Sequence, residues 1–473
     1  MVLLLGLGRM NNFYLVVRLI KNSMRKKFLI KRRHMMDKID CYVKKVAWKL
    51  KEFDYVEQVL LEKDNYLNYG KDKLFPDAPL TMSHGIPGLC LLYAELDRQY
   101  SNEGWMDYCN AYIQKLIELI KIYGIEEPSL FSGCSGICLA ICECSNNGEY
   151  YGKFKESLDA FLKDLIEVKL ELIHSSEETL MFNYDTIQGL SGILNYMLMN
   201  DLNKKYFLEQ IKEILHYFVK LSNKYNYEGI DIPHWRISAE NLFLQEEREL
   251  FPEGAINLGL SHGIAGPLIV MSKAFNSNIK VPGLREAVLS ISELLTANLD
   301  TKHNNWPSMI DIRKLSNKNQ VFDDSRDAWC YGRPGVAYSL LKASQALKNS
   351  QLLYIACETM KSAIDSEIGL ISPTFCHGYI GVSYIYKKFY EVTKIKAFNL
   401  ESKRLMNKTL SFYDENLPFG FPNWEYNTND QNQQEMKMIN TIGILDGVTG
   451  VLLPILSMLG SKKTNWDAVF LLD

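Results

Sequence analysis

The sequence predicts an all-α fold, a seven-fold α/α toroid in which inner helices form a barrel and outer helices surround it. One observation behind this prediction is a Gly-x-x-Gly pattern, followed each time by an apolar run, that occurs seven times in 473 residues. Another is the distance between successive copies, 46 to 74 residues, which accommodates two antiparallel helices and their loops. The glycine pairs are Gly85/Gly88, Gly133/Gly136, Gly189/Gly192, Gly263/Gly266, Gly332/Gly335, Gly378/Gly381 and Gly447/Gly450.

The third observation is that two kinds of helical segment alternate. Segments after the second glycine are apolar on nearly every face, which is typical of helices surrounded by protein. They include 89–96, 137–144, 193–199, 336–343 and 451–459. The segments between them have one charged face, as expected of outer helices. They include 108–122, 206–221 and 284–299. The longest interval, between repeats three and four, has an insertion at about 230–256 that is rich in charge, aromatic residues and helix breakers.

The glycines indicate where each inner helix begins. A tight turn into a closely packed helix favours positive φ values and the absence of a side chain. The residues before each pair are then expected at one mouth of the barrel. Directly before the first glycine stand His84, Ser132, Gln188, His262, Tyr331, His377 and Asp446, and one position earlier stand Ser83, Phe131, Ile187, Ser261, Cys330, Cys376 and Leu445.

Cys330 and Cys376 occupy the same position in adjacent repeats, so they are expected to be neighbours, with His377 beside them. Two thiolates and one imidazole suit Zn²⁺, and three protein ligands leave the fourth tetrahedral position open, as in catalytic zinc sites. The spacing alone leaves a second interpretation open, in which these are buried core cysteines and a hydrogen-bonded histidine.

Four stretches resemble those of the lantibiotic cyclases, the LanC-type lanthionine synthetases. They are Arg-Asp-Ala-Trp-Cys-Tyr-Gly-Arg-Pro-Gly at 326–335, Cys-His-Gly-Tyr-Ile-Gly at 376–381, Leu-Ser-His-Gly-Ile-Ala-Gly at 260–266 and Tyr-Asp-Thr-Ile-Gln-Gly-Leu-Ser-Gly at 184–192. The resemblance extends from about Leu80 to about Pro454. It implies a toroid with one catalytic Zn²⁺ that closes thioether rings in a dehydrated lantibiotic precursor peptide, and a strand-containing insertion that is a candidate for peptide recognition.

Carried over by position, the resemblance implies the zinc ligands Cys330, Cys376 and His377, surrounded by His262, Asp185, Arg326 and Tyr331. The reaction is a Michael-type addition of a peptide cysteine thiolate to dehydroalanine or dehydrobutyrine, and zinc coordination would deprotonate that thiol. We expect His262 to protonate the enolate. Asp185 would orient His262 or act as a base, and Arg326 and Tyr331 would stabilise the enolate or support the fold.

Other functions of the same residues stay open at this point. A LanC-like enzyme that adds an external thiol such as glutathione would share the site. A protein prenyltransferase-like α/α barrel would use an aspartate ligand, and a non-catalytic scaffold would bind no zinc. Three further features are interpreted as structural. The cysteines Cys134, Cys138, Cys142 and Cys144 are expected in the core, His84 away from the site, and Asp446 as a helix cap.

The composition is that of a cytoplasmic enzyme, with 47% hydrophobic and 23% charged residues and a net charge of −3. Ten cysteines without a regular disulfide pattern indicate a reducing compartment. Residues 1–35 form a basic extension, with nine Lys or Arg before residue 35. It is expected to be either a membrane-surface helix or the product of a wrongly chosen start, leaving 36–473 as one catalytic domain. The family resemblance leaves open a complex with a dehydratase and an ABC exporter at the inner membrane face, and no nucleic-acid partner is expected.

Overall fold

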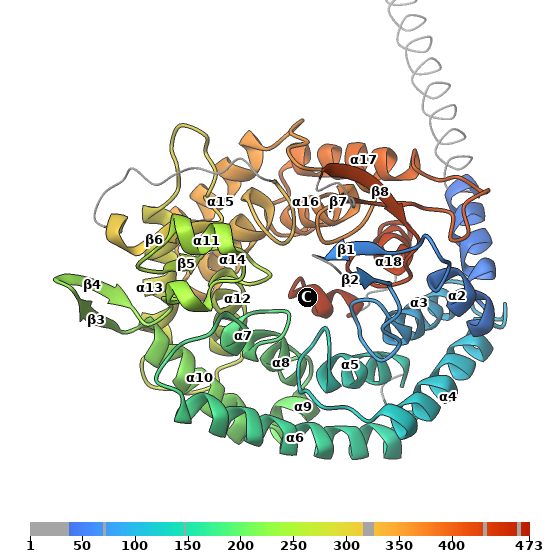
Figure 1. Ribbon diagram of the computed structural model, residues 1–473, viewed down its shortest axis with the longest axis horizontal. Helices are drawn as coiled ribbons and strands as arrows, with labels where there is room; N and C mark the ends of the chain where they lie inside the picture. Colours follow the sequence, from blue (N-terminus) through green and yellow to red (C-terminus); the bar gives the residue numbers. More distant parts are fainter. Residues whose placement is uncertain (1–36, 70–71, 146–147, 316–325, 429–432, 461–464) are drawn as a thin grey trace, which may run out of the picture. The chain divides into compact units, whose positions relative to one another are not determined.

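The computed structural model describes residues 37–69, 72–145, 148–315, 326–428, 433–460 and 465–473 (Figure 1). The chain divides into two compact units, Met1–Lys51 and Glu52–Asp473. The first contains a described helix over residues 37–49. The predicted basic extension, residues 1–35, lies outside the described residues, and the predicted domain boundary there stays a prediction. Among the described helices, none is long and apolar enough to cross a membrane.

Seven inner helices form a closed ring within the unit Glu52–Asp473 (Figure 1). Each contacts the next one along the chain, and the last, α18, contacts the first, α3, so the ring closes. The structure thereby confirms the predicted all-α fold and its inner helices. They are α3 (Ile86–Gln99), α5 (Cys134–Cys144), α8 (Leu190–Met197), α12 (Ala265–Asn276), α14 (Arg333–Leu347), α16 (Tyr379–Thr393) and α18 (Val448–Leu459).

Six long outer helices follow the first six inner helices and pack against them. They are α4 (Trp105–Tyr123), α6 (Gly152–Ser175), α10 (Leu208–Ser222), α13 (Leu284–Ala297), α15 (Ser350–Ser362) and α17 (Lys396–Leu410). Each buries one face, as Ile211, Leu215 and Phe218 of α10 illustrate. Short helices complete the described part of this unit: α2 (Phe53–Leu60), α7 (Met181–Tyr184), α9 (Asp201–Tyr206) and α11 (Gln245–Leu250).

The repeated glycines lie where each inner helix begins, as predicted, but the expected backbone conformation is wrong for most of them. Among the first glycines of the seven pairs only Gly332 has a positive φ, +85°. Close approach explains the other first glycines and also second glycines such as Gly381. A Cβ atom at Gly133 would lie 2.1 Å from the Glu127 carbonyl oxygen, and one at Gly381 would lie 1.9 Å from that of Phe375. Each loop therefore folds back onto its own helix start, and only glycine leaves room for it.

A circular belt of backbone hydrogen bonds joins the seven loops that precede these glycines. In six repeats, the residue two positions before the first glycine donates its backbone N–H to the carbonyl oxygen at the same position of the next repeat. In repeat three, the donor is the residue three positions before the first glycine. The N···O distances are 2.9 to 3.4 Å. The bonds run from Ser83 to Phe131, Phe131 to Ile187, Thr186 to Ser261, Ser261 to Cys330, Cys330 to Cys376, Cys376 to Leu445 and Leu445 back to Ser83. The belt therefore fixes all seven loops relative to one another.

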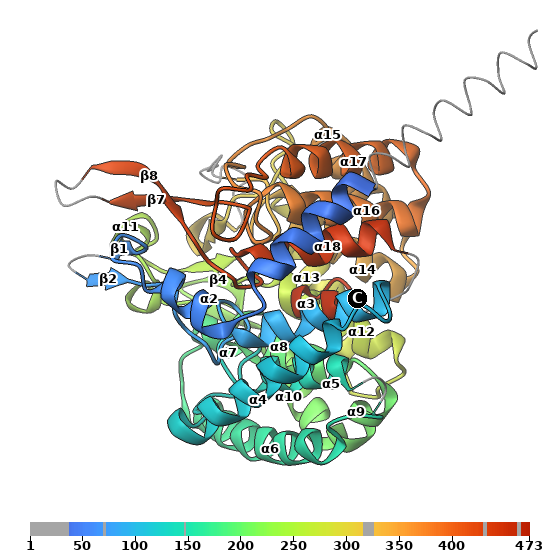
Figure 2. The same ribbon diagram turned by 90° about the vertical axis from the view of Figure 1, so that its right-hand side faces the viewer.

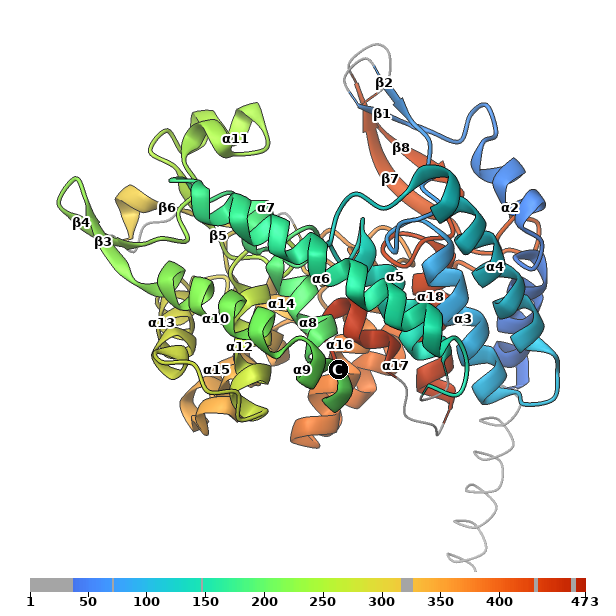
Figure 3. The same ribbon diagram turned by 90° about the horizontal axis from the view of Figure 1, so that it is seen from below.

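Among the described residues, four two-stranded antiparallel sheets lie outside the two rings of helices. The predicted strand-containing insertion is confirmed, because β4 (Ile230–Pro233), the 3₁₀ turn η1 (Ala239–Asn241), α11 and β5 (Ala255–Asn257) lie in it. Strand β4 pairs with β3 (Lys224–Tyr227), and β5 pairs with β6 (Met309–Asp311). The 3₁₀ turn η2 (Ile312–Lys314) follows β6. Two further hairpins, β1–β2 (Leu67–Tyr69, Asp72–Leu74) and β7–β8 (Asn423–Thr428, Gln434–Ile439), were not predicted. Both project away from the chain's C-terminus (Figures 2 and 3).

The segment from η3 (Trp466–Phe470) to Asp473 fills the centre of the inner ring (Figure 1). The ring of Phe470 is fully buried and stacks on Phe375 with centroids 3.6 Å apart. Trp329 packs edge-on against Phe470 and donates its indole N–H to the Phe470 carbonyl at 3.0 Å. Since Trp329 and Phe375 directly precede Cys330 and Cys376, this aromatic cluster supports the belt from inside the barrel.

Replacing Phe470 with alanine is expected to lower the free energy of unfolding by about 3–5 kcal/mol, the usual cost of emptying a buried phenylalanine site. The measurement is a urea unfolding curve. Tyr354→Ala on α15, whose side chain is 60% exposed, is the control and should change stability by less than about 0.5 kcal/mol. Equal midpoints for the two variants would show that the central segment does not support the ring.

Candidate metal centre and active site

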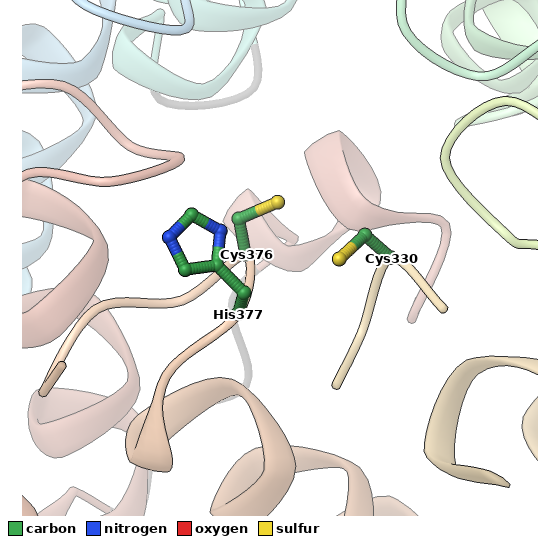
Figure 4. A group of neighbouring side chains, drawn as sticks. All are labelled: Cys330, Cys376 and His377. Atoms are coloured by element: carbon green, nitrogen blue, oxygen red, sulfur yellow. The ribbon is translucent and has the colours of Figure 1, made fainter. Parts of the chain in front are cut away.

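Two neighbouring loops of the belt bring Cys330, Cys376 and His377 together. The N–H of Cys330 donates to the carbonyl oxygen of Cys376 at 3.3 Å, and His377 follows directly. One ligand atom from each of the three side chains lies within 4.8 Å of the other two. Figure 4 shows both sulfur atoms and the Nδ1 side of the imidazole facing a common space. The three residues that sequence analysis placed beside one another are therefore neighbours.

Burial and neighbouring groups shift the pKa values of both thiols and of the imidazole. The hydrogen bond from Cys376 lowers the pKa of Cys330 to about 6 against the opposing effect of burial, and the Arg326 guanidinium adds to the decrease. The pKa of Cys376, the donor, is raised. Burial alone would lower the pKa of His377, but the carboxylates of Asp446 and Glu425 raise it to about 9. The lowered pKa of Cys330 favours its thiolate, which is the form of cysteine that binds metals.

The chemistry of this donor set fits Zn²⁺. Two sulfurs and one imidazole nitrogen are the ligands that zinc prefers, and three protein ligands are typical of its catalytic sites. An orphaned polar atom supports this fit. Oδ1 of Asp446 is buried and has no hydrogen-bond partner among the described residues, and it lies 3.4 Å from Nδ1 of His377. A buried carboxylate oxygen without a donor is costly unless a cation lies nearby.

Two carboxylates beside His377 were missed by sequence analysis. Oε1 of Glu425, on β7, lies 2.9 Å from Nε2 of His377. The interpretation of Asp446 as a helix cap is wrong, because Gly447 is the N-cap residue of α18 and no side chain caps it. Asp446 directly precedes a repeat glycine, so its register position could have assigned it to the site. Glu425 has no such signal, since its hairpin lies between two repeats.

Asp185 and His262 form a second polar pair. Oδ2 of Asp185 lies 2.6 Å from Nδ1 of His262, while Oδ1 accepts the N–H groups of Gln188 and Gly189. The Asp185 side chain is only 1% exposed, whereas that of His262 is 31% exposed. Asp185 is therefore held by its own loop and fixes the ring, which leaves Nε2 of His262 available. Of the two roles that the sequence left open for Asp185, this geometry favours orientation.

Arg326 and Tyr331 flank Cys330 on the same loop. The Arg326 guanidinium lies close enough to the Cys330 sulfur to lower its pKa. Tyr331 accepts a hydrogen bond from Nδ2 of Asn257 at 3.0 Å, and burial raises its pKa well above the usual range. A Cβ atom at Gly259 would lie 2.5 Å from the Tyr331 ring, so this glycine makes room for it.

The remaining candidates have local partners. Cys134, Cys138 and Cys144 are buried in α5, with 3.8 Å between the sulfurs of Cys134 and Cys138, and burial raises the pKa of Cys138. Nδ1 of His84 lies 2.9 Å from the hydroxyl of Ser83. Burial raises the pKa of Asp446, and its electrostatic interactions with His377 and His84 oppose this increase, so His84 lies nearer the metal-site cluster than its repeat number suggests.

Comparison with known proteins decides the family. The family model described as "Lanthionine synthetase C-like protein" matches residues 76–471, which is most of the chain. The chain belongs to the lanthionine synthetase C-like family. The resemblance that the four sequence stretches carry is thereby confirmed.

Individual relatives agree with this membership. The chain is 28% identical over 407 residues to "Nisin biosynthesis protein NisC" of Lactococcus lactis subsp. lactis, which covers 84% of this chain and 90% of that protein. A solved structure of "Nisin cyclase" superimposes with a TM-score of 0.71 and 26% identity, covering 84% of this chain and 92% of the other. The residues matched by the family model, 76–471, include all seven repeats and every candidate site residue.

Proposed function

We propose that this chain is a zinc-dependent lanthionine synthetase, which closes lanthionine and methyllanthionine rings in a dehydrated lantibiotic precursor peptide. One observation carries the proposal: Cys330, Cys376 and His377 converge within 4.8 Å at the mouth of a lanthionine synthetase C-like ring. Their sulfur and nitrogen atoms would hold one Zn²⁺. When bound, the metal would supply a Lewis acid that lowers the pKa of the peptide thiol from its usual value of about 8.5.

The reaction needs a proton at the α-carbon of the acceptor residue. The sulfur–carbon bond forms at the β-carbon, the π electrons of the double bond move onto the carbonyl as an enolate, and the α-carbon then takes a proton. His262 is suited to give it, because Asp185 binds Nδ1, which leaves the Nε2–H of the protonated ring as the donor, and the side chain is 31% exposed. Asp185 acts by holding the ring and the proton in place.

Arg326 has its own role beside the thiols. Its guanidinium is a permanent cation next to Cys330, so it stabilises the ligand thiolate first and a developing enolate second. Tyr331 is held by Asn257 and lines the same loop. We infer that Tyr331 positions this loop and that His262 carries the proton transfer.

Replacing Asp185 with asparagine is expected to move the alkaline limb of the cyclisation rate to lower pH. Burial lowers the pKa of His262, but the hydrogen bond and charge of Asp185 more than offset this, and the net pKa is raised. A raised pKa keeps His262 protonated to higher pH. Without the Asp185 carboxylate, His262 therefore loses its proton, and with it the ability to act as an acid, at a lower pH. At a pH above the pKa of His262 in both proteins, each unit by which the variant's pKa is lower reduces its rate about tenfold relative to the wild type.

The measurement for this variant is the ratio of its rate to that of the wild type as a function of pH, with the same peptide for both. Ionisation of the peptide thiol affects both proteins equally and cancels in the ratio. The ratio should fall as the pH rises from the pKa of His262 in the variant to its raised pKa in the wild type, and it should be constant above that value. A ratio that stays constant with pH would contradict the role of His262 as an acid.

The proposed function is tested with purified protein of measured zinc content and a dehydrated lantibiotic precursor peptide such as that of nisin. After incubation, free thiols are alkylated and counted by mass spectrometry. We expect the peptide thiols to become resistant to alkylation without any change in peptide mass. If glutathione added to the mixture increases the peptide mass instead, the chain adds external thiols. If every thiol stays alkylatable with zinc bound, cyclisation is the wrong function.

We also propose, from the family resemblance, that the chain works in the cytoplasm at the inner face of the membrane, with a dehydratase and an ABC exporter. The supporting feature is the strongly basic composition of residues 1–35. Co-purification of the full chain with membranes containing anionic lipid is the corresponding test. Equal recovery with uncharged membranes would argue against an electrostatic attachment.

A further inference from the structure

Glu425 reaches the metal-site cluster from outside the seven repeat loops. It lies on β7, in the hairpin between repeats six and seven, and its carboxylate contacts His377 at 2.9 Å. Both side chains are largely buried, with 19% of Glu425 and 13% of His377 exposed. An acidic side chain is rarely placed in such surroundings without a partner that needs it.

The two ring nitrogens of His377 face different neighbours. In Figure 4, Nδ1 lies on the side of the two sulfurs, and Nε2 points away from them. The carboxylate of Glu425 is at Nε2, whereas that of Asp446 is 3.4 Å from Nδ1. Glu425 can therefore accept the Nε2–H without competing for the nitrogen that faces Cys330 and Cys376.

The strand that carries Glu425 is tied to the loop that carries His377. The hydroxyl of Ser372, four residues before Cys376, donates to Oδ1 of Asn423 at 3.1 Å. The same hydroxyl accepts the backbone N–H of Trp424 at 3.1 Å. These bonds flank Glu425 on its N-terminal side and fix the strand's distance from the ligand loop.

The other end of β7 is anchored as well. Oδ1 of Asn427 accepts the backbone N–H of Asn68 at 2.7 Å, and Nδ2 of Asn68 donates to the carbonyl oxygen of Thr428 at 2.8 Å. The hairpins β1–β2 and β7–β8 are thus joined beyond Glu425. A strand held on both sides of one residue places that residue's carboxylate with little freedom.

We propose that Glu425 is a positioning residue, whose carboxylate accepts the Nε2–H of His377 and so holds Nδ1 toward Cys330 and Cys376. This inference rests on the proposed metal site. Histidines that bind metals commonly donate their second ring N–H to a carboxylate, which fixes the tautomer and the ring orientation, and loss of that partner weakens metal binding 10- to 100-fold. The hairpin β7–β8 thereby becomes part of the metal centre, although it contributes no ligand.

The test measures zinc affinity by competition with a chromogenic chelator, which does not depend on peptide cyclisation. Glu425→Ala is expected to raise the zinc dissociation constant about 10- to 100-fold. Glu425→Gln retains an oxygen that can accept the Nε2–H, so it should recover most of the lost affinity. The control is Tyr426→Ala, because Tyr426 is the next residue of the strand, is 59% exposed, and should leave the affinity within about twofold.

Two checks separate positioning from general damage and from direct ligation. The thermal midpoints of the metal-free proteins should agree, and the visible spectrum of the Co²⁺-loaded protein should change in Glu425→Ala while Glu425→Gln resembles the wild type. Wild-type affinity in Glu425→Ala would overturn the proposal. Loss of a second equivalent of zinc in Glu425→Gln would also overturn it, because Glu425 would then be a ligand. A wild-type protein that binds no zinc would instead refute the proposed function together with this inference.

Discussion

Replacing Cys376 with alanine is expected to remove the bound zinc and to lower the rate of ring closure about a thousandfold or more. The cysteine supplies one of two sulfurs in a three-residue ligand set, so two ligands remain, too few for a stable site. The hydrogen bond that Cys376 donates to Cys330 is lost as well, and with it the main cause of the lowered pKa of Cys330. A peptide thiol of pKa about 8.5 would then react only as its small thiolate fraction.

The magnitude follows from the chemistry that the site supplies. Lewis-acid stabilisation is worth several kcal/mol, and each 1.36 kcal/mol corresponds to a factor of ten in rate. Zinc content by elemental analysis and cyclisation by thiol alkylation are measured on the same preparation. The matched control is Cys357→Ala, which removes a cysteine from the outer helix α15 and should keep both zinc and activity. Cys376→Ala with full zinc and full activity would place the metal elsewhere.

Replacing His262 with alanine is expected to lower the rate of ring closure about 10²- to 10⁴-fold while zinc stays bound. General acid catalysis by a positioned side chain contributes this range. The residue does not belong to the Cys330, Cys376 and His377 cluster, and its ring is held by Asp185 rather than by a ligand. The variant therefore separates proton transfer from metal binding, which Cys376→Ala cannot do.

Single-turnover rates with excess protein measure this effect without interference from product release. The slow reaction of the peptide without protein is subtracted. His216→Ala on the exposed side of α10 is the control for a histidine outside the site, and it should react as the wild type does. A His262→Ala protein that reacts within about threefold of the wild type would remove His262 from the mechanism. Solvent would then be the source of the α-carbon proton.

The sequence predicted the ring and the metal-site cluster because both follow from one register. Cys330 and Cys376 stand two positions before a repeat glycine, and the belt joins that position in one repeat to the next. Residues at the same distance from their repeat glycine, such as Cys330 and Cys376, are therefore neighbours in the structure. The register also placed His262 at the mouth of the barrel, and the family resemblance added Asp185 from the preceding repeat; the two side chains meet at 2.6 Å.

What the sequence did not predict lies outside that register or depends on packing. Glu425 belongs to a hairpin inserted between repeats, so it has no fixed position relative to a repeat glycine. Only the folded chain brings it to His377. The central segment with Phe470 follows the last repeat and carries no periodic signal. The sequence predicted correctly where the glycines lie but not why they are needed. Gly133 and Gly381 allow close backbone contact and do not adopt a positive φ.

The central claim is that ring closure by this chain depends on a metal held by Cys330, Cys376 and His377. The most direct measurement removes the metal with a chelator, dialyses the chelator away, and follows alkylatable thiols on a dehydrated precursor peptide before and after one equivalent of Zn²⁺ is returned. We predict that the metal-free protein leaves the peptide thiols alkylatable at the uncatalysed rate, and that one equivalent restores full activity. Equal rates of ring closure by the metal-free and the reloaded protein would contradict the claim.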